Sequence, residues 1–328
     1  MKLHLDVNAF RVLLDTIHSR TGYRTDVLEK DYYVVLILKE LAEKQQQGLP
    51  AYFKGGTALY KALKTTNRFS EDIDLSVDTR GCSNAQNKKR LEDATKKYHS
   101  LERNVDEGTT NRSVIISVYN YHPITAFDKD DELQRFGKLK IEATSFTISE
   151  PTTSLEITPL IYEQATAEEQ RVLREQYDVA PINVLTITVE RIFIDKLFAA
   201  EAYVRASSNP HRAFESAKHI YDLSVMMKQT NIQALFADEK SMQQLLDIRM
   251  QEERSRKDGI SGVLPKEFMF FDAIQTNEAV EKAYQTMQKQ YVLRPEDRIP
   301  FETAFTSMQQ IKSNLLKCKA WAEYEALI

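Results

Sequence analysis

Cysteine is almost absent from this chain of 328 residues, and glycine and proline are scarce. The two cysteines, Cys82 and Cys318, lie far apart and form no CxxC pair, so the sequence contains neither a disulfide framework nor a zinc-binding signature. Nine glycines and nine prolines are too few for a fibrous or largely disordered protein. This cysteine usage is typical of a reducing compartment, and we expect a cytoplasmic location.

Long apolar runs are also missing. Residues 1–6 lack the apolar stretch of a signal peptide, and the most apolar early window, residues 32–38, is far too short to span a bilayer. We therefore expect no membrane partner. The formal net charge of −4, from 44 basic and 48 acidic residues, argues against a surface coated in positive charge. A local basic face would still be enough to hold phosphates.

What the chain does contain is the composition of a globular protein, with 42% hydrophobic and 28% charged residues. Its length suits one large domain or two of ordinary size. The six histidines form no helical i, i+4 pair and no triad pattern with a serine, so hydrolase and zinc-enzyme functions have little support.

The order of apolar and polar residues predicts an N-terminal pair of helices, then a mixed α/β core, then a helical C-terminal half. The expected helices are residues 5–20, 26–45, 57–64 with Thr57 as the cap, 84–99, 188–205 and 212–227, and most of the chain beyond. The expected strands are residues 51–53, 72–77, 113–119, 138–149 and 154–159. The fold class is therefore α+β, with a core domain over residues 1–180 and a helical domain over residues 181–328.

Two aspartates on the second expected strand, Asp72 and Asp74, carry the strongest chemical signal. Side chains two apart on a strand project to the same face, which leaves Ile73 and Leu75 for the core. Nucleotidyl transfer suits two divalent metals that clamp the attacking and leaving oxygens, and Mg²⁺ requires hard oxygen ligands on a rigid element. The pair therefore predicts a site for two Mg²⁺ (or Mn²⁺) ions with a nucleoside triphosphate.

The segment Lys54-Gly55-Gly56-Thr57 precedes this strand, at an expected strand-to-helix turn. Glycines allow backbone N–H groups to approach phosphate oxygens closely, the helix N-terminus adds favourable partial charge, and the Thr57 hydroxyl is a further donor. Either motif alone is common. Together, with Arg68 and Ser70 between them, they form a more specific signal for a nucleotide-binding site.

A third carboxylate usually completes such a metal site, and Glu142 in Lys140-Ile141-Glu142-Ala143 is the best candidate. It is a charged residue flanked by small or apolar ones on an expected strand. The alternative is an ordinary exposed glutamate. Beside Asp72 and Asp74 we favour the metal role for Glu142.

These motifs match a known family. Lys54-Gly55-Gly56-Thr57-Ala58-Leu59 followed by Arg68-Phe69-Ser70-Glu71-Asp72-Ile73-Asp74-Leu75 resembles the AbiEii/AbiGii family of nucleotidyltransferase toxins, relatives of the MenT toxins. Leu28-Glu29-Lys30-Asp31-Tyr32-Tyr33 looks like the family's usual N-terminal helix, and the resemblance also includes Lys196 and Asp222. It covers residues 28–230, and nothing specific is recognised beyond.

The resemblance implies a polymerase-β-like nucleotidyltransferase fold. Asp72 and Asp74 would be metal ligands, Lys196 would reach the phosphates of the nucleotide, and Asp222 would be a further essential acid. Relatives are toxin halves of toxin–antitoxin pairs, some of which modify the acceptor end of tRNA. The family's helical motif is often a lysine followed four residues later by an aspartate, but here that position is Ala200 and the nearby acid is Glu201.

Each of these residues also has a possible structural role that involves no ligand. Lys196 lies on a largely apolar helix, where it either reaches solvent from the edge of the apolar face or points into a cleft. Asp222 would need a partner if buried, such as Lys218. The alternative roles of the remaining residues are a salt bridge from Arg68 to Glu71, a cap at Ser70, an exposed Glu71, and a capping-region acid at Glu190.

Two basic clusters are candidates for tracking an RNA backbone. One is Lys88-Lys89-Arg90 with Lys96-Lys97, and the other is Arg254-Ser255-Arg256-Lys257. Acidic neighbours dilute both of them: Glu92, Asp93, Glu252 and Glu253. We favour a solvated helix face for each cluster.

The leading hypothesis is a metal-dependent nucleotidyltransferase that moves a nucleoside monophosphate from a nucleoside triphosphate to an acceptor. The resemblance implies that the acceptor is an RNA end such as tRNA, and that the chain is a toxin with a cognate antitoxin. One alternative is transfer to a protein side chain. Another is a non-catalytic nucleotide-binding module of the same fold, against which the intact pair Asp72 and Asp74 argues.

Overall fold

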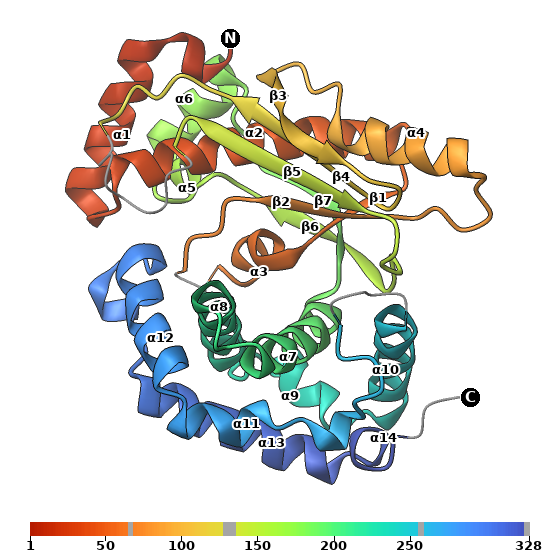
Figure 1. Cartoon of the computed structure of the whole chain (residues 1–328). Coiled ribbons are helices and arrows are strands. Elements are labelled where there is room, and N and C mark those ends of the chain that lie inside the picture. Colours follow the sequence, from red (N-terminus) through yellow and green to blue (C-terminus); the bar gives the residue numbers. More distant parts are fainter. Residues whose placement is uncertain (65–67, 127–135, 255–258, 325–328) are drawn as a thin grey trace. The chain divides into compact units, whose positions relative to one another are not determined.

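The computed structural model describes residues 1–64, 68–126, 136–254 and 259–324, which form two compact units (Figure 1). We call Met1–Ile187 the sheet unit and Thr188–Ile328 the helical unit. The division follows residue 187 rather than 180, because the last strand, β7 (Ile182–Ile187), pairs with two other strands of the sheet. The predicted α+β class is confirmed, since a mixed sheet with flanking helices is followed by a helical region.

The sheet unit is built on seven strands in the order β3-β4-β5-β2-β1-β7-β6. Pairing is parallel between β5 and β2 and between β1 and β7, and antiparallel elsewhere. The strands other than β7 are β1 (Ala51–Lys54), β2 (Ile73–Val77), β3 (Glu102–Thr110), β4 (Val114–Asn120), β5 (Lys138–Thr144) and β6 (Thr152–Ile157). The two motif-bearing strands, β1 and β2, are therefore direct neighbours.

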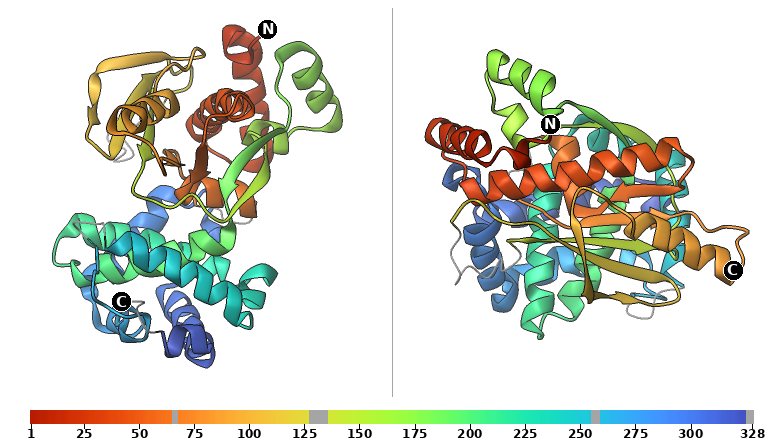
Figure 2. Two further views of the ribbon diagram at one scale, coloured as in Figure 1. Left: turned by 90° about the vertical axis from the view of Figure 1, so that its right-hand side faces the viewer. Right: turned by 90° about the horizontal axis from the view of Figure 1, so that it is seen from above.

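Helices α2 and α4 pack on one face of this sheet (Figures 1 and 2). On that face, Tyr119 of β4 donates its hydroxyl to the carbonyl of Thr95 at the end of α4, and Ala143 and Leu75 share this side of the sheet through their register. The helices of the unit are α1 (Val7–Thr21), α2 (Thr25–Gln46), α3 (Gly55–Leu63), α4 (Asn84–Thr95), α5 (Leu160–Glu163) and α6 (Ala167–Tyr177). Alternation then places Asp74 and Glu142 on the opposite face.

The middle of α2 is buried on every side, including three consecutive charged residues. Glu29 accepts hydrogen bonds from the backbone N–H groups of Ile124 and Thr125. Lys30 forms an ion pair of 2.5 Å with Glu71, the residue that precedes Asp72 in the sequence. The prediction that Glu71 is exposed was wrong, because this pair holds its side chain in the core at 4% exposure.

Asp31, the third of these charges, joins α2 to two other elements. One carboxylate oxygen pairs with Lys61 of α3, and the other accepts the backbone N–H of Leu160 at the start of α5, at 2.6 Å. Lys61 also donates to the carbonyl of Thr158 at 3.1 Å. The family-like stretch on α2 is therefore a buried anchor that fixes the elements around the two motifs.

Some element boundaries differ from prediction. Helix α3 begins at Gly55, so Thr57 is not its cap, and the helix 84–99 ends at Thr95. The strand 138–149 ends at Thr144, and β3, α6 and β7 were not expected. Strand β3 was missed because its nine residues are mostly polar and exposed, which removes the alternation that marks a half-buried strand.

The helical unit begins with α7, whose N-cap Thr188 accepts a hydrogen bond from the backbone N–H of Arg191. Its helices are α7 (Val189–Arg205), α8 (Pro210–Met226), α9 (Thr230–Leu235), α10 (Glu239–Glu253), α11 (Phe270–Ala273), α12 (Glu278–Tyr291), α13 (Phe301–Lys317) and α14 (Lys319–Ala322). Helices α12 and α13 pack against α8. In the described part of the chain, no helix is both long enough and apolar enough to cross a membrane.

Candidate active site

Three charged residues form one row across the middle of the sheet. Lys54 of β1 is the register partner of Asp74 on β2, and Asp74 is the partner of Glu142 on β5. Register partners on neighbouring strands point to the same face, so the sequence-predicted acids of β2 and β5 are side by side. The Lys54 ammonium donates to the Thr144 hydroxyl at 3.1 Å.

Lys140 places a positive charge between the acids of this face. Its Nζ lies 3.3 Å from Oδ2 of Asp72 and 3.5 Å from Oε2 of Glu142. Burial alone would lower the pKa of Lys140, but the carboxylates of Asp72, Glu142 and Asp74 outweigh this and raise it. Sequence reasoning missed Lys140 as a site residue. The available signal was its position two residues before Glu142, which puts both side chains on the same face.

Asp74 is the most perturbed of the acids. Burial, followed by the negative charges of Asp72 and Glu142, raises its pKa to about 6, although Lys54 and Lys140 oppose the shift. A carboxyl group that resists ionisation because it is buried and because like charges lie near it would gain from a cation placed among them. Raised pKa values with a specific charge partner are typical of functional sites.

The two glycines make room for side chains of the chain itself. Gly55 has φ +78°, and a Cβ there would stand 2.3 Å from Oδ2 of Asp74. A Cβ on Gly56 would stand 2.8 Å from the Ser70 hydroxyl and 3.1 Å from Nη2 of Arg68. The sequence argument for glycine was close approach of phosphate. The structure adds a reason, which is that Asp74 and Ser70 already occupy the space beside the turn.

Thr57 is buried, and its hydroxyl donates within the chain. The hydroxyl lies 2.5 Å from the carbonyl oxygen of Asp72 and 3.0 Å from the Ser70 hydroxyl. In this state it binds α3 to the segment before β2 and is not directed to an open position. Arg68 is also buried, and one of its N–H groups donates to the carbonyl of Phe69 at 3.3 Å.

The donors on the sheet face fit a divalent metal in kind. Asp72, Asp74 and Glu142 are hard oxygen ligands, and burial together with the charges of Asp72 and Glu142 raises the pKa of Asp74. Across residues 1–64, 68–126, 136–254 and 259–324, however, no three His, Cys, Asp or Glu side chains form a ready metal-binding group. The ammonium of Lys140 contacts two of the three acids.

In the helical unit, Lys196 of α7 and Asp222 of α8 form a buried ion pair. Their Nζ and Oδ2 atoms are 2.6 Å apart, and both side chains are almost inaccessible to solvent. The predicted partner of Asp222, Lys218, was wrong, since Lys218 pairs with Glu215 at 2.8 Å. Two residues that the family resemblance singled out separately are therefore in direct contact.

The remaining acids of the helical unit have structural contacts. Glu190 lies in the first turn of α7, as predicted, and accepts a hydrogen bond from Asn231 at 2.7 Å. Glu201 is fully buried, pairs with Arg205 and accepts the backbone N–H of Phe270 at 2.8 Å. These contacts explain why Glu201, despite its place near Lys196, does not act as its partner.

Glu252 and Glu253, the acidic neighbours of the second basic cluster, are buried. Glu252 pairs with Arg191 at 2.7 Å and with Arg249 at 3.2 Å, and Arg249 also pairs with Glu253. The cluster Arg254-Ser255-Arg256-Lys257 lies, apart from Arg254, outside the described residues. Its two acidic neighbours belong to a core network that ties α10 to α7.

Comparison with known proteins decides the family. The sequence model of the family described as nucleotidyl transferase AbiEii toxin, type IV TA system, matches residues 36–307. The chain belongs to this family. The match begins after the α2 charges at residues 29–31 and extends well past residue 230, where the motif-based resemblance ended. A sequence search among curated proteins gave no match.

Solved structures similar to this AbiEii-family chain include two bacterial proteins. MenT4, a nucleotidyltransferase toxin from Mycobacterium tuberculosis H37Rv, is 15% identical with a TM-score of 0.43, covering 92% of this chain and 99% of that one. JHP933 from Helicobacter pylori is 17% identical with a TM-score of 0.36, covering 90% of this chain and 95% of that one. Each alignment spans nearly the full length of both chains.

Proposed function

We propose that this AbiEii-family nucleotidyltransferase transfers a nucleoside monophosphate from a nucleoside triphosphate to an RNA acceptor, with tRNA as the first candidate. The hydroxyl of the acceptor attacks the α-phosphate, the bond from that phosphorus to the β-phosphate oxygen breaks, and pyrophosphate leaves. The observation that carries the proposal is the row of Lys54, Asp74 and Glu142 with Asp72 and Lys140 beside it, on one sheet face next to a glycine turn.

The glycine turn supports binding of the triphosphate. Helix α3 begins at Gly55, directly after its N-cap residue Lys54. Backbone N–H groups in the first turn of a helix are suited to phosphate oxygens, and the helix dipole favours negative charge there. Lys54 adds a cation at the same turn, and Arg68 and Ser70 lie against Gly56.

Asp72, Asp74 and Glu142 are the residues that would hold two Mg²⁺ or Mn²⁺ ions. Such ions would neutralise charge on the phosphates and lower the pKa of the attacking hydroxyl. The protein's own part is to keep the carboxylates on a rigid sheet and to hold Asp74 against the glycine turn. Lys140 would have to release Asp72 and Glu142 for the site to fill, and its ammonium would then be available to phosphate.

The helical unit is proposed to contribute Lys196 and Asp222. A buried lysine paired at 2.6 Å with a buried aspartate is held in one position, which suits a phosphate-contacting cation better than a mobile surface side chain does. Support for this role comes from the family resemblance and from the pairing within the unit.

The test is incubation of the purified chain with each α-³²P-labelled nucleoside triphosphate, Mg²⁺ and total tRNA. Wild type is expected to label RNA and to release pyrophosphate, and Asp72→Ala/Asp74→Ala is expected to abolish both. Glu168→Ala/Glu175→Ala, which removes two exposed acids of α6, serves as the matched control. Label transfer that survives the Asp72/Asp74 double substitution would contradict the role of these carboxylates.

The same experiment separates the alternatives. Label on protein and not on RNA would select a protein-modifying enzyme. Binding of a nucleoside triphosphate without turnover on any acceptor would select a binding module. A cognate antitoxin is the further partner that the family description suggests, and a neighbouring gene whose product relieves growth arrest caused by the wild-type chain would identify it.

A further inference from the structure

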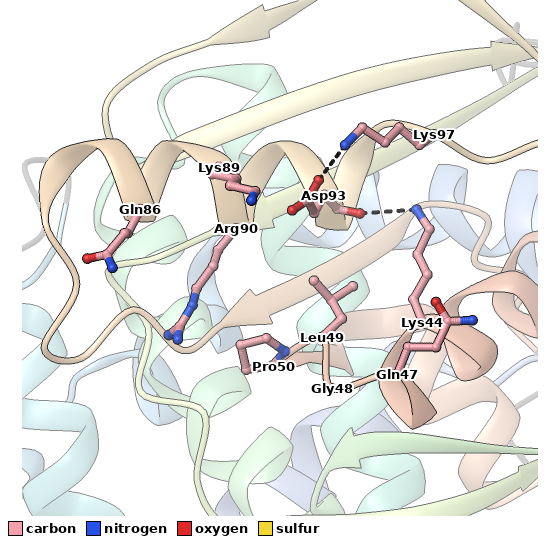
Figure 3. Close-up of a pocket in the computed structure, with 10 residues that line it drawn as sticks. All are labelled: Lys44, Gln47, Gly48, Leu49, Pro50, Gln86, Lys89, Arg90, Asp93 and Lys97. Carbon is pink, nitrogen blue, oxygen red and sulfur yellow. Dashed lines mark hydrogen bonds and ion pairs between the residues drawn. The ribbon is translucent and has the colours of Figure 1, made fainter.

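A basic pocket lies between the C-terminal end of α2, the loop after it and one face of α4 (Figure 3). Its volume is about 470 Å³, which is within the size range of ligand sites. It is lined by Lys44, Gln47, Gly48, Leu49, Pro50, Gln86, Lys89, Arg90, Asp93 and Lys97. The cluster Lys88-Lys89-Arg90 with Lys96-Lys97, interpreted from sequence as a solvated face, contributes three of these residues.

The pocket is separate from the candidate active site. Its loop enters β1 at Ala51, which pairs with Val77, whereas Lys54 at the other end of β1 pairs with Asp74. Three residues of strand span roughly 10 Å. The pocket also lies on the side of the sheet where α2 and α4 pack, and Asp74 and Glu142 face the other side.

The charge of the pocket is uneven. Four cations line it against one acid, Asp93, which pairs with Lys97 at 2.8 Å. Lys44 donates to the carbonyls of Asp93 and Lys96, and Arg90 donates to the carbonyl of Asp78 at 2.7 Å. Neutral carbonyls orient these cations without cancelling their charge. An anion placed there would find positive groups already held in position.

The shape of the pocket favours a chain over a single small anion. The pocket residues of α4, at 86, 89, 90 and 93, are spaced so that they form one face of the helix over about 10 Å, and Lys97 follows just beyond the helix end at Thr95. Phosphates follow one another at roughly 3.4 Å along the axis of a duplex strand, so a strip of this length covers about three of them. Lys89 and Lys97 are exposed, Lys89 on the helical face and Lys97 beyond the end of α4.

We propose that this strip, formed by the pocket-lining face of α4 and Lys97, binds the phosphodiester backbone of the RNA acceptor. The proposal rests on the proposed function for the identity of the acceptor, but it concerns a different surface. The pocket would hold the body of the RNA through its backbone and without sequence preference, because the cations and amides that line it match phosphate oxygens.

The test is fluorescence anisotropy of fluorescein-labelled tRNA with the full-length protein in EDTA and without nucleotide. Lys89→Glu is expected to weaken binding about three- to tenfold and to reduce the salt dependence by about one phosphate contact. Lys88→Glu, the same change at an exposed neighbour that does not line the pocket, is expected to stay within about twofold. Asp93→Asn removes the acid of the pocket and is expected to tighten binding about threefold.

Equal affinities of Lys89→Glu and Lys88→Glu would overturn the proposal, as would a wild type that does not bind tRNA. It would also be overturned if Lys89→Glu altered binding of inorganic pyrophosphate or poly-L-glutamate and left tRNA binding unchanged. Tighter binding by Asp93→Asn is a result that a purely structural role of the pocket does not produce. Thermal unfolding monitored by circular dichroism checks that each variant is folded.

Failure of this inference is distinguishable from failure of the proposed function. If tRNA binds with the expected dependence on Lys89 but no label is transferred, the docking strip stands and the transfer reaction fails. If label is transferred to tRNA but Lys89→Glu binds tRNA as wild type does, the reaction stands and the strip fails.

Discussion

Lys140 contacts Asp72 and Glu142 with a single ammonium, at 3.3 and 3.5 Å. It therefore supplies part of the positive charge that the proposed metal ions would supply. A resident cation of this kind offsets part of the repulsion between clustered carboxylates, and it would compete with a metal ion for them. The Lys140 ammonium thus holds the carboxylates of Asp72 and Glu142 close together, and it lowers the affinity of these carboxylates for a metal ion.

Lys140→Met is expected to raise Mn²⁺ affinity roughly tenfold at pH 8, because removal of the competing ammonium is equivalent to about 1.4 kcal/mol of binding free energy. Isothermal titration calorimetry measures this directly. Lys138→Met is the matched control, since Lys138 is on the same strand but pairs with Glu107. Unchanged or weaker Mn²⁺ binding by Lys140→Met would show that the ammonium does not compete.

Asp74 links the stability of the protein to pH. Its pKa is about 6 in the folded chain, above the ordinary value of 3.8, so the folded state favours the protonated form. This contribution to stability is fully present below pH 3.8 and is lost as the pH rises through about 6. In EDTA, Asp74→Asn is therefore expected to be more stable than wild type above pH 6, by at most about 3 kcal/mol.

Urea unfolding at several pH values tests this expectation for Asp74. The difference in the free energy of unfolding between Asp74→Asn and wild type should shrink as the pH falls from 6 toward 4. A difference that is constant over this range would mean that the Asp74 carboxyl is not the titrating group.

Two features of Gly55 exclude a side chain, its positive φ and the closeness of Asp74, and Gly22 shares only the first of them. Gly55→Ala is expected to lower the free energy of unfolding by about 1–3 kcal/mol, because a side chain at φ +78° is strained and its Cβ would collide with Asp74. Gly22→Ala carries the same strain at φ +76°, but nothing lies within 4 Å of its added Cβ. Only Gly55→Ala should also lose nucleotidyl transfer, measured with the labelled-triphosphate assay.

At the scale of elements, α2 carries its charges in the core, and the Asp31–Lys61 pair joins it to α3. Lys61→Met is expected to cost about 3–5 kcal/mol, because the Asp31 carboxylate would remain buried with less compensation. Lys61→Met/Asp31→Asn should recover much of this loss, since the amide that replaces the carboxylate carries no charge. Chemical denaturation of the double-mutant cycle measures the coupling, and strictly additive losses would argue against the pair.

The elements that could be predicted from the sequence are those whose pattern follows from burial on one side. Apolar and polar residues alternate along β2 and recur at helical spacing along α7 and α8, as they do in half-buried elements. The predicted positions of these three elements were correct within a few residues. Helix α2 was predicted, but its buried charges were not, because an ion pair depends on residues distant in sequence such as Glu71. The exposed strand β3 gave no alternation and was missed.

The candidate site was partly predictable for a similar reason. The spacing of two residues between Asp72 and Asp74 is given directly by the sequence, although β2 begins at Ile73, and Asp74 shares a face with Glu142 through the strand register. Their adjacency depends on the strand order, which places β5 beside β2, and that order cannot be derived from local pattern. The contacts of Lys140 with Asp72 and Glu142, and the pairing of Lys196 with Asp222, became visible only with the tertiary structure.

At the scale of the whole molecule, all seven strands belong to the sheet unit, which has its own core. A fragment of residues 1–187 is therefore expected to fold alone, with cooperative urea unfolding followed by circular dichroism. It is expected to lack nucleotidyl transfer, because Lys196 and Asp222 belong to the other unit. Transfer by the fragment at the rate of the full chain would remove those two residues from the mechanism.

The row of Lys54, Asp74 and Glu142 also affects the register in which strands β5 and β2 pair during folding. A slip of one residue between β5 and β2 would turn Lys140 and Glu142 toward the helices α2 and α4, and would expose Leu139 and Ile141 in their place. Burying two charges without partners is far more costly than any pairing that the slipped strands could gain. The charged residues proposed for catalysis therefore also determine the strand register, because they destabilise any sheet in which β5 and β2 are paired one residue out of register.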